Sequence, residues 1–138
     1  MELILNVGIG SIRFAKTPVE VHALISEEPT YEDWMGGNRN DSLLFHGLIF
    51  GFDGCDSTGP LENSRLTEVS IHGREDVVLW GRNICYWTKD AVKDHLDRNG
   101  LPYQIVANGD VSVDSSLAIS FDNAGRLEYI EMWDAARR

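Results

Sequence analysis

Hydrophobic and polar residues alternate along four stretches of the chain, and this pattern predicts four β-strands. They are residues 48–53, 65–71, 117–122 and 126–132. Alternation with a period of two gives a strand one buried face and one face turned to water. Eleven residues separate the first two strands, and three separate the last two. The spacing therefore predicts two antiparallel hairpins, the first with a long turn and the second with a short one.

Two further segments carry the spacing of an amphipathic helix. The first begins at Thr17, with Pro18 at the first helical position and Glu20 completing a capping box. The second begins at Thr88 and ends before Gly100. Their apolar faces are formed by Val21, Leu24 and Ile25 in the first helix and by Val92 and Leu96 in the second.

Helix and hairpin follow one another in the same order in both halves of the chain. The two capping threonines are 71 residues apart, and Phe52-Asp53 has a counterpart in Phe121-Asp122. Short internal repeats of this kind indicate a duplicated unit. We therefore expect an α+β fold made of two tandem strand–helix–hairpin repeats, with the helices packed on one face of an antiparallel sheet.

The predicted repeats comprise residues 1–72 and residues 73–138. The first repeat differs from the second by long acidic insertions at residues 26–42 and 54–64. It contains 11 acidic and 4 basic side chains, whereas the second contains 11 acidic and 8 basic ones. The acidity is thus concentrated in the first half.

The whole chain of 138 residues has 22 acidic against 12 basic side chains, a net charge of −10. Such a surface repels phosphate groups, which disfavours direct binding to nucleic acid or to an anionic membrane. It suits a basic protein partner instead. At 43% hydrophobic residues the chain can bury a core without a metal or a disulfide.

The N-terminal residues show neither the basic start nor the apolar stretch of a signal peptide, and no segment offers about 20 apolar residues to span a membrane. Cys55 and Cys85 lack the spacing of metal ligands. We expect a soluble cytoplasmic protein with reduced thiols. A disulfide between the two cysteines stays open as an alternative.

Residues 10–29 resemble a sequence motif found in tandem-repeat inhibitor domains of the β-lactamase-inhibitor-protein type and in related outer-membrane lipoproteins. In those domains a strand ends in Phe-Gly-Met-Thr, a helix begins near Pro-Glu-Glu-Val, and a Gly-Pro turn follows. Here Phe14 and Thr17-Pro18 match, but Ala15-Lys16 replaces Gly-Met and Ser26-Glu27-Glu28 replaces the glycine turn. The hairpin at residues 121–127 extends the likeness.

This resemblance implies an inhibitor or binding module and transfers no catalytic residues. Small acidic proteins of this appearance also resemble the immunity proteins of bacterial polymorphic and contact-dependent toxin systems. Such proteins bind and neutralise a cognate toxin. The resemblance therefore implies an antitoxin that acts through protein–protein interaction.

Candidate catalytic and metal-binding patterns all fail in this sequence. The four histidines are scattered, at His22, His46, His72 and His95, and none forms a zinc-type pair. The segment Gly8-Ile-Gly10 opens no helix and so does not form a phosphate cradle. We expect no enzyme activity, no cofactor and no metal, and we expect Asp53 and Asp122 to stabilise turns rather than bind calcium.

Aromatic residues surrounded by carboxylates are typical of protein-binding hot spots. Tyr31 and Trp34 lie among four acidic residues in the first insertion, and more carboxylates follow. A nuclease toxin needs a basic groove for phosphates, and an acidic surface would cover that groove. The predicted partner-binding residues are Glu27, Glu28, Glu32, Asp33, Trp34, Asp41, Asp56 and Glu62.

Other interpretations of the same sequence remain open. One is a small-ligand-binding or hydrolytic domain with a site between the two repeats, using Asp53, His46 and His72. Another is a scaffold or assembly subunit, although we favour a monomer. Trp34 could also dock on the core while its acidic neighbours are merely solvated. The remaining tryptophans, Trp80, Trp87 and Trp133, are expected in the core or at the seam between the repeats.

Overall fold

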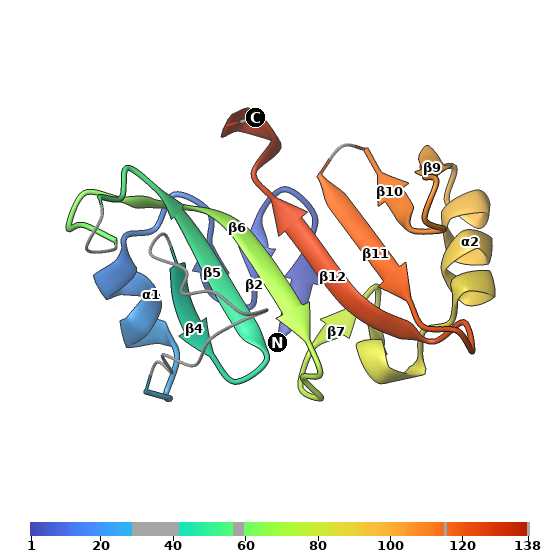
Figure 1. Cartoon of the computed structure of the whole chain (residues 1–138), viewed down its shortest axis with the longest axis horizontal. Coiled ribbons are helices and arrows are strands. Elements are labelled where there is room, and N and C mark those ends of the chain that lie inside the picture. Colours follow the sequence, from blue (N-terminus) through green and yellow to red (C-terminus); the bar gives the residue numbers. More distant parts are fainter. Residues whose placement is uncertain (29–41, 57–59, 115, 138) are drawn as a thin grey trace.

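An antiparallel seven-stranded sheet forms the centre of the molecule (Figure 1). The computed structural model describes residues 1–28, 42–56, 60–114 and 116–137. In order across the sheet, the strands are β4 (Ser42–Phe45), β5 (Leu48–Asp53), β6 (Arg65–His72), β12 (Leu127–Trp133), β11 (Leu117–Phe121), β10 (Val111–Val113) and β9 (Tyr103–Ile105). The four strands predicted from alternation are confirmed, and so are the two hairpins that they form.

The two halves of the chain meet where β6 pairs with β12. Ser70 lies opposite Glu131 near the middle of this pair. Val69 and Ile71 on β6 and Ile130 and Met132 on β12 are buried, while the residues between them point to the other face of the sheet. Strands from residues 1–72 and from residues 73–138 therefore share a single hydrophobic core.

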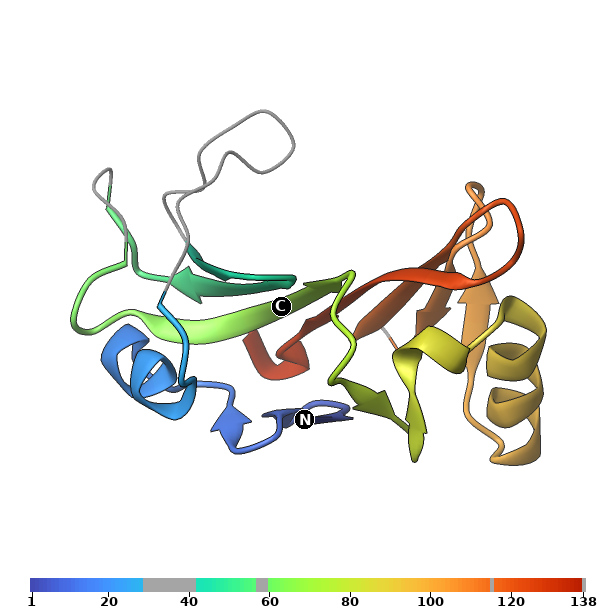
Figure 2. The same cartoon turned by 90° about the horizontal axis from the view of Figure 1, so that it is seen from below.

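A second sheet lies against one face of the large sheet (Figure 2). Its strands are β3 (Ile12–Arg13), β2 (Gly8–Ile9), β1 (Glu2–Ile4), β7 (Val78–Leu79) and β8 (Arg82–Asn83), in that order. The pair of β1 and β7 is parallel, whereas we expected antiparallel pairing throughout. The short strand expected before each helix corresponds to β3 and β8. The sequence pattern did not predict β1, β2 or β7, because strands of two or three residues are too short to show alternation. The fold class is α+β, with more strand than helix.

Both predicted helices are confirmed, together with their starting residues. α1 (Pro18–Leu24) begins after Thr17, whose hydroxyl accepts a hydrogen bond from the Glu20 amide at 3.3 Å. The Glu20 carboxylate in turn accepts from the Thr17 amide at 3.1 Å, which completes the capping box. α2 (Lys89–Arg98) begins after Thr88, which accepts from the Ala91 amide at 3.2 Å.

α2 buries the face that its spacing predicted, whereas α1 does so only in part, because Leu24 is 43% exposed while Val21 and Ile25 are buried. The two helices lie near opposite ends of the large sheet (Figure 1). Val21 of α1 and both Val92 and Leu96 of α2 have no exposed surface. The chain leaves α2 through Gly100, whose φ of +63° is a left-handed conformation that glycine adopts without strain.

The β7–β8 hairpin turns through two residues with positive φ, Trp80 at +50° and Gly81 at +79°. Such a turn matches the twist of the two strands, but a bulky residue rarely occupies its first position. A short 3₁₀ helix (Ile84–Tyr86) follows, and it leads to Trp87 in the core. The expected core position is confirmed for Trp87, and the expected position at the seam is confirmed for Trp133, which lies opposite Glu68 in the β6–β12 pair. Trp80 is partly buried and packs against the core.

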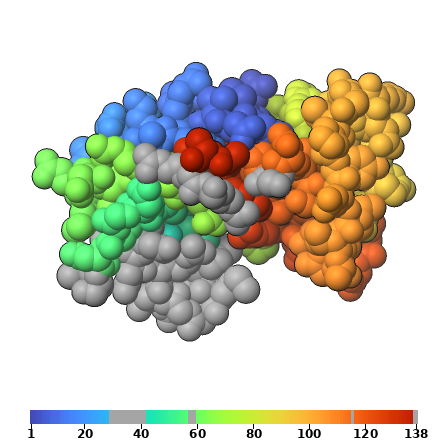
Figure 3. Space-filling view, turned by 90° about the horizontal axis from the view of Figure 1, so that it is seen from above, coloured from blue at the N-terminus to red at the C-terminus, as the bar shows by residue number. Residues whose placement is uncertain are grey.

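The C-terminal residues of the chain fold back towards its beginning. A second 3₁₀ helix (Ala135–Arg137) follows β12, and the Asp134 amide donates to the Thr67 carbonyl at 2.8 Å. Figure 3 shows this end of the chain, in red, between the N-terminal residues in blue and the orange strands of the second half.

Candidate functional site

Four of the eight predicted partner-binding residues lie within the described part of the chain: Glu27, Glu28, Asp56 and Glu62. The other four, Glu32, Asp33, Trp34 and Asp41, fall in residues 29–41, outside the described ranges. The four described residues do not form one patch, because they are found at the two ends of β5.

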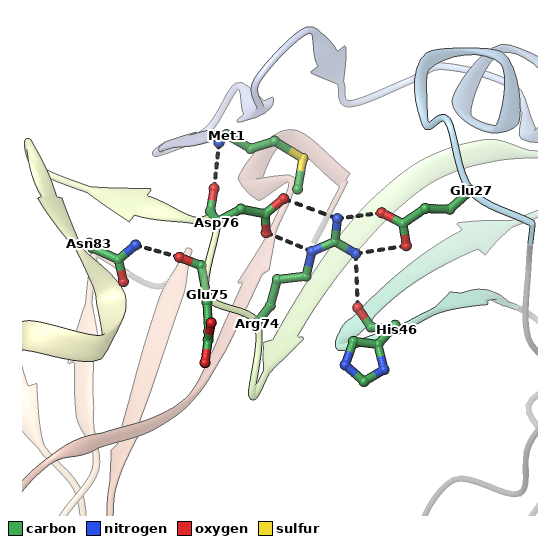
Figure 4. A network of polar contacts seen from close by, with 7 residues as sticks. All are labelled: Met1, Glu27, His46, Arg74, Glu75, Asp76 and Asn83. Carbon is green, nitrogen blue, oxygen red and sulfur yellow. Dashed lines mark hydrogen bonds and ion pairs between the residues drawn. The ribbon is translucent and has the colours of Figure 1, made fainter.

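Glu27 belongs to an ion-pair cluster centred on Arg74, which we call the Arg74 clasp (Figure 4). Arg74 donates to both Glu27 carboxylate oxygens, Nη1 to Oε1 at 3.0 Å and Nη2 to Oε2 at 2.5 Å. It also donates to both oxygens of Asp76, at 2.6 and 3.1 Å, and to the His46 carbonyl at 2.9 Å. Bidentate pairs of this kind are strong and directional.

The clasp connects three segments that are distant in the sequence. Glu27 follows α1, His46 lies in the turn between β4 and β5, and Arg74 and Asp76 lie between β6 and β7. Only 11% of the Arg74 side chain is exposed. The hydrogen bonds that Arg74 donates lower the pKa of Asp76, and the bonds it donates to Asp76 and Glu27 raise its own pKa. Glu27 therefore helps to hold the three segments together, and both oxygens of its carboxylate already accept hydrogen bonds from Arg74.

The other three predicted partner-binding residues that the structure describes are exposed. Glu28 is almost fully exposed, with one carboxylate oxygen 3.8 Å from Nε2 of His22. Asp56 and Glu62 are exposed in the turn that joins β5 to β6. The six residues of β5 span about 20 Å between this turn and the Arg74 clasp.

The residues of the alternative ligand site do not converge either. Asp53 lies at the end of β5 and accepts a hydrogen bond from the Arg65 amide at 3.2 Å, so it closes the hairpin turn. Asp122 does the same in the second hairpin, accepting from the amides of Ala124 and Arg126. His46 and His72 lie at the opposite end of β5, where the His72 amide donates to the Gly47 carbonyl. The predicted turn role of the two aspartates is confirmed.

Three further features of the described residues bear on other kinds of site: the cysteines, the possible metal-binding side chains and a small cleft. Cys55 and Cys85 are both thiols and form no disulfide. Among the described residues, no three metal-binding side chains gather at one point. A shallow cleft of about 210 Å³ is lined by Pro102, Tyr103, Gln104, Ser112 and Asp114. Sites for small ligands typically have volumes of about 300–1,000 Å³, so this cleft is small.

The face of the large sheet turned away from the small sheet carries a band of polar and aromatic side chains. No described helix or strand lies across this face (Figure 2). Three cross-strand pairs of β6 and β12 form its centre, which we call the central stripe: Glu68 with Trp133, Ser70 with Glu131, and His72 with Tyr129. These residues alternate with the buried ones, so all six point to the same face.

Acidic and aromatic groups dominate the central stripe. It contains two glutamates and neither lysine nor arginine. The Tyr129 hydroxyl donates to Oε1 of Glu131 at 2.7 Å. Burial raises the pKa of Tyr129 to about 12, and the neighbouring Glu131 and Glu68 add to this effect. Tyr129 therefore remains a protonated donor that holds the Glu131 carboxylate in place.

Two of the residues flanking the stripe are small: Gly51 of β5 lies opposite Glu68, and Ala118 of β11 lies opposite Glu131. Ile49 of β5 lies opposite Ser70, and both are buried. A Cβ atom at Gly51 would lie 3.2 Å from the Glu68 Cβ, so a larger residue there would press on the glutamate. The predicted alternation placed Glu68 with Ser70, and Tyr129 with Glu131, on one face of each strand, but the stripe itself arises only from the pairing of β6 with β12.

Comparison with known proteins finds no relative: no family model, no curated protein and no solved structure matches this chain. Within the described residues, every helix is too short or too polar to cross a membrane.

Proposed function

We propose that this protein is an immunity protein that binds a cognate bacterial toxin, with a nuclease the best fit, and covers its basic active site. The observation that carries the proposal is the central stripe, where carboxylate and aromatic side chains share one face of the large sheet around the buried Ser70, and where the Tyr129 hydroxyl donates to Glu131. Aromatic residues with fixed side chains are the usual anchors of protein interfaces. Carboxylates beside them would attract a cationic partner and select against an acidic one.

Acidic residues of the two first-half insertions would extend the same interaction. Glu28, Asp56 and Glu62 are exposed, and the net charge of −10 favours approach of a basic partner over the whole surface. The predicted residues Glu32, Asp33, Trp34 and Asp41 belong to this proposal as further contacts. In this mechanism the toxin's phosphate-binding groove is filled by carboxylates, so its nucleic-acid substrate is excluded.

We also infer that the two halves are tandem repeats, with both helices on one face of the sheet. Counted outward from the boundary between β6 and β12, strands β6, β5 and β4 of the first half correspond to β12, β11 and β10 of the second half. Aligning Arg65-Leu66 with Arg126-Leu127 gives an offset of 61, which makes Ser70 the counterpart of its own partner Glu131. Such a register is expected for two related units joined about a two-fold axis. The shared core of Val21, Val92 and Leu96 supports the placement of the helices.

The direct test is binding to the basic C-terminal domain of a secreted protein encoded immediately upstream. Glu131→Lys should slow association at least about tenfold and reduce its dependence on salt, because it reverses a charge at the centre of the stripe. Glu75→Lys makes the same charge change on the exposed connection between β6 and β7, and should have a much smaller effect. Association rates at several salt concentrations measure both.

A triple variant separates the stripe from the first insertion. Reversal of Glu28, Glu32 and Asp33 to lysine should slow association and weaken its salt dependence as well. Unchanged binding in this variant would show that the insertion is not used. Equal effects of Glu131→Lys and Glu75→Lys would show that only net charge matters, and a folded protein that does not bind the toxin domain would overturn the proposed function.

A further inference from the structure

Three aromatic side chains from different elements pack together at the second-half end of the molecule. Trp80 is at the tip of the β7–β8 hairpin, Trp87 follows the first 3₁₀ helix, and His95 is on α2. The His95 ring stacks on Trp80, with centroids 4.4 Å apart and planes 17° from parallel. Trp87 meets both rings edge-on, each at 5.6 Å. We call these three residues the aromatic latch.

Trp87 is the fixed member of the latch. Only 3% of it is exposed, and its indole Nε1 donates to the Leu79 carbonyl at 2.9 Å and to the Arg82 carbonyl at 3.3 Å. Trp80 is different, because it is partly exposed and its φ of +50° is unfavourable for a bulky residue. Contact with His95 and Trp87 offsets this backbone strain.

Charged groups reach His95 from the hairpin and from its own helix. The guanidinium carbon of Arg82 lies 4.2 Å from the centre of the Trp87 ring. Asp94 precedes His95 on α2 and is paired with Arg98 at 3.1 Å. The pKa of His95 is lowered from 6.5, first by burial and then by the positive charge of Arg82, while Asp94 opposes the shift.

We propose that the aromatic latch is sensitive to protons: neutral His95 holds the hairpin tip against α2, and protonated His95 releases Trp80. A proton on the partly buried imidazole would place a second cation beside the Trp87 ring that Arg82 already covers. Release of Trp80 would hydrate the imidazolium and relieve the left-handed backbone. Mild acid would thus loosen the β7–β8 hairpin, and this inference does not depend on the proposed immunity function.

The near-ultraviolet circular dichroism of the stacked indoles measures the latch directly. In the wild-type protein this signal should decrease as the pH falls, with a midpoint below 6.5. His95→Gln removes the titrating group and should abolish the transition between pH 7.5 and 5. His22→Gln, the matched change in the other helix, should leave the transition unaltered.

Histidine NMR titrations test the same latch without relying on the His95 variant to fold. In Trp80→Asn, a residue that tolerates left-handed backbone replaces the stacking ring, and the pKa of His95 should rise towards 6.5. A wild-type His95 pKa at or above 6.5 would mean that the Trp80 face stabilises the imidazolium, which overturns the proposal. A circular dichroism transition that persists in His95→Gln would overturn it too.

Discussion

The elements around the two helices are held by different chemistry. Near α1, the Arg74 clasp connects the segment after the helix to two turns through ion pairs and a carbonyl group. Near α2, the aromatic latch connects the helix to the β7–β8 hairpin through stacked rings. The clasp joins residues of both halves of the chain, whereas the latch lies wholly within residues 73–138. The two connections should respond to different changes in solution.

The difference follows from burial. The Glu27 and Asp76 side chains of the clasp are 38% and 55% exposed, so water competes for them and salt screens them. Trp87 of the latch is almost completely buried, and its stability contribution comes mainly from apolar area removed from water. We therefore expect the latch to contribute more to stability and the clasp to respond more to salt.

Removing the buried ring of the latch should have the largest effect. Trp87→Ala would leave a cavity in the core and abolish the bond to Leu79, and should lower the free energy of unfolding by about 3–5 kcal/mol. Urea denaturation measures this loss. Tyr86→Ala is the control, because Tyr86 is 75% exposed and its removal should cost less than about 0.5 kcal/mol. Similar losses in both variants would contradict a core role for Trp87.

Removing the cation of the clasp should have an intermediate effect. Arg74→Met keeps much of the side-chain volume but leaves Glu27 and Asp76 without their donor. We expect a loss of about 2 kcal/mol, less than for a fully buried pair because water still reaches both carboxylates. Arg98→Met is the matched control, since Arg98 forms an exposed pair with Asp94 that is worth less than about 0.5 kcal/mol.

The smallest of the three effects is the response of the clasp to acid. The clasp should lose its contribution to stability at a lower pH than the latch does. Because Arg74 lowers the folded-state pKa of Asp76 below its ordinary 3.8, the contribution of Asp76 is complete above pH 3.8. It is lost as the pH falls through the folded-state pKa. Asp76→Asn should therefore be less stable than wild type at pH 7, and this difference should shrink at pH 2.5.

Urea denaturation of both proteins at the two pH values checks this prediction. The latch titrates in a separate range, below pH 6.5, because its sensitive group is a histidine. If the Asp76→Asn difference already disappeared at pH 5, another group would control the clasp, and the contrast between the two connections would fail.

Local signals predicted the helices and the main hairpins well. Thr17 with Glu20 and Thr88 mark helix starts because a cap involves residues three positions apart. The long strands were predicted from the recurrence of apolar residues along six to eight positions, although β5 buries five residues in a row. Of the small sheet, only the short strands before the two helices, β3 and β8, were expected, because strands of two or three residues carry little pattern. The pairing of this sheet depends on β1 meeting β7, more than 70 residues later.

The candidate site shows the same limit. Sequence reasoning grouped Glu27 with Glu28 as neighbouring exposed charges. Local pattern could not show that Arg74, 47 residues further on, would pair with Glu27. The strands β6 and β12 were likewise predicted separately. Alternation places Tyr129 and Glu131 on one face of β12, and only the pairing of the strands brings Glu68 beside them.

The sequence by itself determined where helices begin, where the long strands lie, and the excess of negative charge. These properties depend on neighbouring residues or on a sum over the chain. The tertiary structure alone decided which carboxylates are paired inside the protein, which strands adjoin, and which histidine packs against two indoles. Those outcomes depend on contacts between residues far apart in the chain, and local preference carries no information about their distances.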